Sequence, residues 1–200
     1  MKGFSFERLI CHQLSQWWSG SDDRDIFWRT AGSGGRATNR FKKGKKTVHC
    51  GDICAVSPDG KPLTDLLTLE LKRGYTSASL TNLMDRTDWS AIKDWEEWIT
   101  KAEVAKENSG SFSWAIICRR DQRKAIITFP KSVFELLYGE LRIVTPKVQL
   151  EVHIRSSGGK QQILFELVSV LLDDFLALVK KESVIKALER LERRKNLGPS

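Results

Sequence analysis

The spacing of apolar residues predicts two long amphipathic helices. Near the N-terminus, apolar side chains recur every three or four residues, and Ser5 can cap the helix that we expect over residues 5–18. A second run of this kind predicts a helix over residues 88–108, with Asp88 as its N-cap. Trp95 lies on the apolar stripe of that helix, so we expect most of the tryptophans at positions 89, 95 and 98 to pack in the core.

Shorter apolar runs predict strands before, between and after these helices. They cover residues 26–29, 47–56, 68–72, 112–118 and 124–129. The second and third runs are joined by residues 57–61, in which Pro58, Asp59 and Gly60 are typical of a tight turn. Helices interleaved with strands in this order favour an α/β fold, with a sheet covered by helices on its faces.

The pattern changes in the last third of the chain to one hairpin and a helical tail. Ser132 and Glu135 form a capping-box sequence, which predicts a short helix ending near Tyr138. The hairpin strands and the helical tail cover residues 148–155, 161–168 and 169–195, the tail with a break near residues 182–183. We therefore divide the chain into a core domain, residues 1–139, and a C-terminal hairpin with helices, residues 140–200. The second part either belongs to the same domain or serves as a dimerisation element.

Composition and charge indicate a folded protein with a polyanionic partner. The 200 residues include 40% hydrophobic residues and seven tryptophans, which is enough to build a core. The net charge of +8 favours a partner such as nucleic acid, and six basic residues fall within residues 36–46. No apolar run is long enough to span a membrane, and the N-terminus lacks the apolar core of a signal peptide, so we expect a cytoplasmic protein.

Two carboxylates and a lysine stand out on the second and third strands. Asp52 lies on the first of these, and Glu70 and Lys72 on the next. Side chains alternate across a strand, so Glu70 and Lys72 point to one face and their leucine neighbours to the other. If the strands are neighbours, two hard oxygen donors and an ammonium meet at one point. Carboxylates suit Mg²⁺, which also binds substrate phosphate, and the lysine can position a water or help to deprotonate it. These are the groups needed to cut a phosphodiester.

The order of these residues resembles the PD-(D/E)XK nuclease superfamily. Further similarities lie at residues 6–9 of the first helix, at residues 29–33, and around Asp52 and Glu70. They are closest to the archaeal Holliday-junction-resolvase branch and related phage endonucleases, and they extend over residues 4–129. The resemblance implies a restriction-endonuclease-like fold, a mixed central sheet flanked by helices. It also implies a Mg²⁺-dependent endodeoxyribonuclease, selective for branched DNA and acting as a homodimer.

The resemblance also implies a role for each residue of the site. Asp52, Glu70 and the main-chain carbonyl of Leu71 would bind Mg²⁺, for which Mn²⁺ could substitute. Glu7 on the first helix would reach the metal directly or through water, and Lys72 would position the attacking water. We expect the DNA backbone to contact Arg29, Ser33, Arg36, Arg40, Lys42, Lys43, Lys45 and Lys46.

Two departures leave alternatives open. Gly51 stands where the family has proline, whereas a literal Pro-Asp occurs at Asp59, and Asp65 comes shortly before Glu70. We prefer Asp52, because the sequence around Asp59 is typical of an exposed turn, whereas a carboxylate among apolar neighbours needs a partner or a metal. The rival for the whole site is a simple cross-strand salt bridge.

Three rival functions also stay open at this point. The first is a restriction-like or DNA-end-processing phage nuclease. The second is a non-catalytic nucleic-acid-binding protein on a nuclease-like fold. The third is an interaction module whose basic residues contact an acidic protein. RNA is an alternative substrate to DNA.

Overall fold

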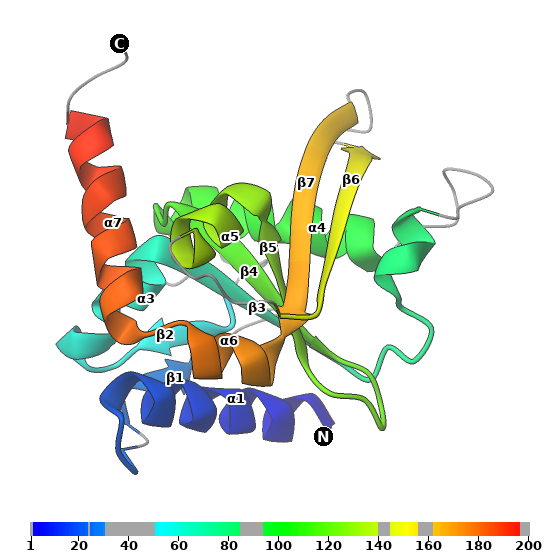
Figure 1. Ribbon diagram of the computed structural model, residues 1–200. Helices are drawn as coiled ribbons and strands as arrows, with labels where there is room; N and C mark the ends of the chain where they lie inside the picture. The colour runs from blue at the N-terminus through cyan, green and yellow to red at the C-terminus, as the bar shows by residue number, and fades with distance from the viewer. Residues whose placement is uncertain are drawn as a thin grey trace, which may run out of the picture.

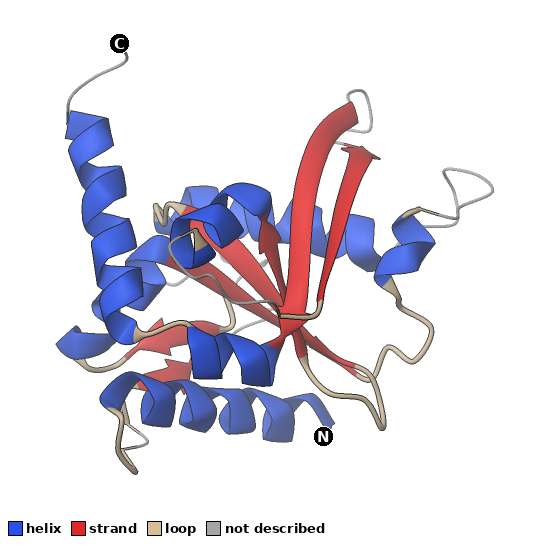
Figure 2. Ribbon diagram, in the orientation of Figure 1, coloured by secondary structure: helices blue, strands red, loops and turns tan. Residues whose placement is uncertain are grey.

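A computed structural model shows a mixed α/β fold, as the sequence predicts (Figures 1 and 2). The structure describes residues 2–23, 25–30, 51–84, 94–139, 145–155 and 162–196. A five-stranded sheet lies at the centre, with helices on both of its faces. None of the helices in the described ranges has the length and apolar character of a membrane span.

The central sheet has the strand order β3-β4-β5-β7-β6. The strands are β3 (Leu67–Arg73), β4 (Ser113–Arg119), β5 (Ile126–Pro130), β6 (Lys147–Arg155) and β7 (Gln162–Leu171). β3 and β4 are parallel, and the other neighbours pair antiparallel. A parallel pair requires a crossover, and helix α4 (Asp94–Ser109) lies between the two strands in the chain.

A smaller antiparallel pair lies beside the edge strand β3. It consists of β1 (Phe27–Arg29) and β2 (Ile53–Ala55). Its link to the central sheet is Asp52, whose main-chain N–H donates a hydrogen bond to the carbonyl of Leu69 on β3 at 2.8 Å. The predicted second and third strands are therefore neighbours in space. The predicted strand over residues 47–56 is shorter here, and residues 47–50 lie outside the described ranges.

The two faces of the central sheet are covered by different helices. One face packs against α1 (Lys2–Ser19), α3 (Lys61–Leu66), α5 (Lys131–Tyr138), α6 (Leu172–Leu178) and α7 (Lys181–Asn196). The other face, which we call the α4 face, packs against α4 and the 3₁₀ turn η2 (Leu80–Leu83). Figure 1 shows α5 and α6 in front of the sheet and α4 behind it. Leu69 and Leu71 belong to the first core and Trp114 and Ile116 to the second, as strand alternation requires.

The two large tryptophans of α4 lie in the core, which confirms the expectation from their spacing. Trp95 and Trp98 are 1% and 3% exposed. Position 89 and the predicted N-cap Asp88 lie outside the described residues. The described helix begins at Asp94.

The structure corrects three local predictions. The turn at residues 57–61 is the 3₁₀ helix η1 (Pro58–Gly60) followed directly by α3, a helix that the pattern did not predict. Ser132 does not cap the short helix, because α5 begins at Lys131 after an N-cap at Pro130. The helical tail begins later than expected, since β7 continues to Leu171, and its break falls at residues 179–180.

The C-terminal hairpin extends the central sheet. β7 pairs with β5 on one side and with β6 on the other, and α6 and α7 pack on the first core. One sheet therefore runs through both parts into which the sequence divides the chain. A role of the hairpin or its helices in dimerisation stays a prediction.

Candidate active site

Asp52 is held in place by the edge of β3. Its main-chain N–H donates to Leu69, and its side-chain Oδ2 accepts a hydrogen bond from the N–H of Leu71 at 2.8 Å. Its own carbonyl accepts from the N–H of Thr30 at 2.9 Å. Main chain and side chain together thus continue the hydrogen bonding of the strand edge. The orientation of the carboxylate is fixed by backbone groups rather than by flexible side chains.

The residue before Asp52 must be a glycine. Gly51 has a φ of 97°, a conformation that side-chain-bearing residues rarely adopt. A Cβ at this position would lie 2.8 Å from Cγ2 of Thr68 and 3.0 Å from the carbonyl oxygen of Leu69. The close approach of this backbone to β3 therefore excludes a side chain.

Glu70 and Lys72 lie on the α4 face of β3 and contact each other. Their register partners on β4 are Ile116 and Cys118, which belong to the α4-side core. Nζ of Lys72 lies 2.8 Å from Oε2 of Glu70, and the two side chains are only 15% and 12% exposed. Burial lowers the pKa of Lys72, but Glu70 and Asp52 outweigh it and raise the pKa above its usual value. Lys72 is therefore a cation at neutral pH.

The electrostatics of Asp52 reveal an excess of negative charge around it. Burial, together with the nearby charge of Glu70, raises the pKa of Asp52 to about 6. Lys72 and the hydrogen bond from Leu71 oppose this rise, and Glu7 adds to it. The sequence-predicted residues Asp52, Glu70, Lys72 and Glu7 thus lie close enough to influence one ionisation.

Glu7 reaches the site from α1 but is bound by Arg29. Nη1 of Arg29 on β1 lies 3.0 Å from Oε2 of Glu7, and both side chains are partly buried. The sequence analysis assigned Glu7 to a metal and Arg29 to DNA. The structure pairs the two side chains with each other, and both assignments stay predictions.

Two thiols and a tyrosine lie near the site, and the sequence analysis gave none of them a role there. Burial raises the pKa of Cys11 to about 12; Cys54, Glu7 and Asp52 add to the rise, and Arg29 opposes it. Tyr75 lies near enough to Lys72 to raise its pKa. The only sequence signal for Tyr75 was its place three residues after Lys72.

The two rival carboxylates lie elsewhere. Asp59 is in η1, and both of its carboxylate oxygens lie 2.8 Å from Nζ of Lys181 on α7. Asp65 is in α3, where it faces Lys61 at 3.9 Å on the exposed side of the helix. Asp52 is the candidate acid that contacts β3 through its side chain.

The comparison with protein families identifies the family of the chain. Residues 1–186 match the model of a family described as "Phage putative PDDEXK endonuclease". The chain belongs to this PDDEXK endonuclease family. Searches of curated proteins and of solved structures found no match. The superfamily inferred from the sequence is confirmed, and the Holliday-junction-resolvase branch stays a prediction.

Family membership implies a nuclease with a nucleic-acid substrate, and PDDEXK nucleases generally use divalent metals. Among the described residues of this PDDEXK endonuclease, no group of three or more His, Cys, Asp or Glu side chains is arranged to hold a metal ion. The available donors are the two carboxylates of Asp52 and Glu70 and backbone oxygens. Because the N–H of Leu71 points toward Asp52, its carbonyl points to the same edge of β3.

The predicted DNA contacts of this PDDEXK endonuclease lie mostly outside the described residues. These are Ser33, Arg36, Arg40, Lys42, Lys43, Lys45 and Lys46. Arg29, which pairs with Glu7, is the one predicted contact within the described ranges.

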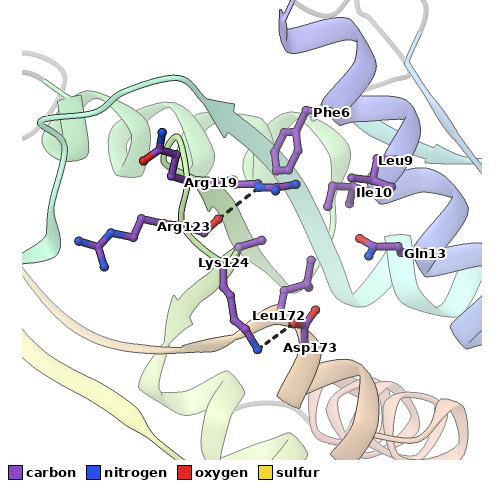
Figure 3. A pocket seen from close by; sticks show the side chains of 11 residues that line it. Phe6, Leu9, Ile10, Gln13, Arg119, Arg123, Lys124, Leu172 and Asp173 are labelled. Carbon is purple, nitrogen blue, oxygen red and sulfur yellow. Dashed lines mark hydrogen bonds and ion pairs between the residues drawn. The ribbon is translucent and has the colours of Figure 1, made fainter.

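A cavity of about 420 Å³ lies on the opposite face of the sheet from Glu70 and Lys72 (Figure 3). Phe6 and Leu9 of α1 form one wall, and Arg119 and Lys124 the other. Figure 3 shows Nε of Arg119 donating to the carbonyl of Arg123 and Lys124 facing Asp173. None of the four sequence-predicted site residues, Asp52, Glu70, Lys72 and Glu7, lines this cavity, so it is separate from the carboxylate site.

Proposed function

We propose that this protein is a Mg²⁺-dependent endodeoxyribonuclease that hydrolyses phosphodiester bonds. The observation that carries the proposal is the environment of Asp52. The residue is fixed by two hydrogen bonds to β3, one to its carboxylate and one from its main-chain N–H, and it shares its surroundings with Glu70. The pKa of Asp52 is raised to about 6. A surface salt bridge, the rival interpretation, would leave its groups exposed, whereas Glu70 and Lys72 are largely buried.

The donor set fits a hard divalent cation. The charge of Glu70 raises the pKa of Asp52, and a positive ion between the two carboxylates would relieve this repulsion. Oxygen donors are those that Mg²⁺ and Mn²⁺ take. Asp52, Glu70 and the carbonyl of Leu71 would hold the ion, with water and substrate phosphate completing its shell. When bound, the ion would neutralise charge on the phosphate and make a water more acidic.

Lys72 supplies a fixed positive charge beside the reacting phosphate. Its raised pKa keeps the ammonium protonated, so it orients the attacking water and stabilises developing negative charge rather than removing a proton. Glu70 holds Lys72 in position at 2.8 Å. Arg29 holds Glu7 in the same way at 3.0 Å, so Glu7 acts by adding negative charge near Asp52.

The preferred substrate is branched DNA, and the active form is a homodimer. Both statements rest on the resemblance to junction-resolving enzymes and on the net charge of +8.

Cleavage of a mixed nucleic-acid panel tests the proposal. The panel contains single-stranded DNA, linear duplex, a flap, a four-way junction and an RNA duplex, each with Mg²⁺ and with EDTA. We expect cutting only with Mg²⁺ or Mn²⁺, and fastest at the junction. Fastest cutting of linear duplex or of its ends would replace the junction-selective proposal by a restriction-like or end-processing one.

The panel also separates catalysis from binding. Tight, salt-sensitive DNA binding without cutting in either metal would indicate a non-catalytic binder. Size-exclusion chromatography with light scattering, on the same sample, tests the homodimer.

A further inference from the structure

A second cavity lies on the α4 face of the sheet, beside the catalytic lysine. It has a volume of about 400 Å³, within the range of small-ligand pockets. Cys118 lines it and is the register partner of Lys72 on the neighbouring strand. Partners on neighbouring strands point to the same face, so the cavity opens one strand away from Lys72 on the face that carries Glu70.

Aromatic rings connect the catalytic lysine to this cavity. Tyr75, which influences the pKa of Lys72, packs edge-on against Trp98 with ring centroids 4.8 Å apart. Trp98 in turn packs on Trp95 at 5.0 Å, and Trp95 lines the cavity. Tyr75 is 41% exposed at the open end of this row. Exposed and cavity-lining aromatic rings are the surfaces on which nucleobases stack.

Trp95, which lines the cavity, has a buried hydrogen-bond donor without an acceptor. Its side chain is 1% exposed, and within the described ranges its indole Nε1 has no hydrogen-bond partner. Buried donors are normally paired, because an unpaired donor loses its hydration without compensation. The remaining wall is largely apolar, from Leu80, Ile126 and Val148. A planar ligand fits this wall.

Cations lie at the rim of the cavity where the β4–β5 turn, residues 120–125, passes it. Arg120 and Arg123 of this turn line it. Lys124 and Lys147 line it as well, but their ammonium groups face Asp173 and the ring of Phe134 on the other face of the sheet. Gln122 at the tip of the turn has a φ of 59°, which is uncommon for a residue with a side chain. The turn stands between the two cavities, since Arg123 and Lys124 line both of them. An apolar pocket with cations at its mouth matches a base joined to a phosphate.

We propose that this cavity binds one unpaired nucleotide of the nucleic-acid substrate. The base enters between Trp95 and Ile126, and Arg120 and Arg123 bind its phosphate. The cavity thereby recognises a strand in which a nucleotide has left the helix, as at a bulge, a flap or a branch point. This deepens the proposed function and rests on it for the choice of a nucleic-acid chain over a free nucleotide.

Binding without cleavage tests the pocket independently of catalysis. Fluorescence anisotropy in EDTA compares a duplex carrying one unpaired nucleotide with a fully paired duplex of the same length. We expect the wild-type protein to bind the first about tenfold more tightly, the usual effect of stacking one base. An abasic residue at the unpaired position should remove that advantage.

Variants that fill the cavity or remove its cations localise the effect. Val148 lines the cavity and is 53% exposed, so Val148→Trp fills it from the rim without opening the core. This variant should lose the preference and keep its affinity for paired duplex. Ile163→Trp, at a position 46% exposed on β7, adds the same bulk elsewhere and should keep the preference.

The charge variants test the phosphate contacts. Arg120→Gln with Arg123→Gln should weaken binding of the unpaired-nucleotide duplex and reduce its log–log salt slope by about two. Arg193→Gln with Arg194→Gln removes equal charge from exposed positions on α7, at the far side of the molecule in Figure 1, and should do neither.

The outcomes separate the two proposals. Equal affinity of wild-type protein for both duplexes overturns the pocket, even if Mg²⁺ supports cutting. A preference that Val148→Trp abolishes, in a protein that cuts nothing, keeps the pocket and overturns the nuclease. Competition by 2′-deoxyadenosine 5′-monophosphate, without any duplex preference, reassigns the cavity to a free nucleotide and overturns the substrate assignment.

Discussion

Asp52 and Asp59 belong to one short segment of the chain but lie in opposite environments. Asp52 is partly buried, its side chain accepts from backbone, and its pKa is raised to about 6. Asp59 is 52% exposed in a turn and binds Lys181, which also lies 5.3 Å from the ring of Trp18. Asp59 has a cation of its own, whereas Asp52 shares one lysine with Glu70.

The difference separates the proposed catalytic carboxylate from a structural one. An exposed ion pair contributes little to stability, and its charges need no further partner. A partly buried carboxylate beside another one carries an unfavourable charge that a metal ion would relieve. The unfavourable electrostatic energy of Asp52, rather than a match to the Pro-Asp sequence motif, therefore identifies the candidate catalytic acid.

The cleavage rate should show the largest difference between the two aspartates when each acid is removed in turn. Asp52→Ala and Glu70→Ala should each lower the Mg²⁺-dependent cleavage rate by at least about a hundredfold, because each removes a charged group from the reacting centre. Asp59→Ala should cut at nearly the wild-type rate. Single-turnover cleavage of the best panel substrate, with DNA affinity as the control, measures this. An inactive Asp59 variant beside an active Asp52 variant would reverse the assignment.

The second-largest difference between the two aspartates should lie in their effect on the pH dependence of stability. The pKa of Asp52 rises from 3.8 in the unfolded chain to about 6 in the fold, so the folded state binds the extra proton between these values. The free energy of unfolding of the metal-free protein should therefore fall as pH rises through this window. The share of Asp52 is roughly 3 kcal/mol.

Urea unfolding in EDTA between pH 4 and pH 7 measures that share. Asp52→Asn keeps an acceptor for the N–H of Leu71 and should flatten this part of the curve. Asp59→Asn removes the same charge from the exposed site and serves as the control. Identical slopes in wild type and Asp52→Asn would remove the electrostatic basis of the comparison.

Metal binding should also distinguish the Asp52 site from the Asp59 site, in the absence of substrate. Mg²⁺ at one hundred times its dissociation constant stabilises a folded protein by about 2.7 kcal/mol. We expect thermal unfolding of the wild type and of Asp59→Ala to shift upward with Mg²⁺, and that of Glu70→Ala to stay unchanged. A shift that survives in Glu70→Ala but disappears in Asp59→Ala would move the ion to the exposed site.

The smallest effect should be the loss of the Asp59–Lys181 pair itself. Asp59→Ala should lower the free energy of unfolding by less than about 1 kcal/mol, because both groups are partly hydrated. The indole of Trp18 donates to the main-chain carbonyl of Asp59, and that bond remains in the variant. Urea unfolding at pH 7 measures the change. A loss of several kcal/mol would mean that this pair supports the fold.

Features set by local spacing were predictable from the sequence. The N-terminal helix, β3, β4 and β5 follow the periods of their apolar residues. The ion pair of Glu70 with Lys72 follows from alternation along one strand. The proximity of Asp52 to β3 was conditional on the pairing of distant segments, which no local pattern determines.

The missed features depend on tertiary context. α3 was not predicted because Pro58 and Gly60 indicate a turn. Pro62 nevertheless fits the first turn of a helix, where its missing N–H costs nothing. β7 extends beyond its predicted end because Ser169 shares a buried hydrogen bond with Thr128 on β5. The pairing of Glu7 with Arg29 needed α1 and β1 side by side, which sequence spacing does not show.

The backbone at Gly51 has a consequence for how relatives of this protein can be recognised. Proline holds φ near −65°, so the superfamily's namesake Pro-Asp dipeptide cannot be restored at positions 51 and 52, where φ is 97°. The literal dipeptide that the chain does contain, at Asp59, belongs to the structural ion pair. A text search of this chain for Pro-Asp thus returns the aspartate of the structural ion pair. The proposed catalytic aspartate is marked instead by the φ of Gly51 and by the contact of Asp52 with β3, and a search for Gly-Asp followed by Glu-x-Lys finds it in this chain.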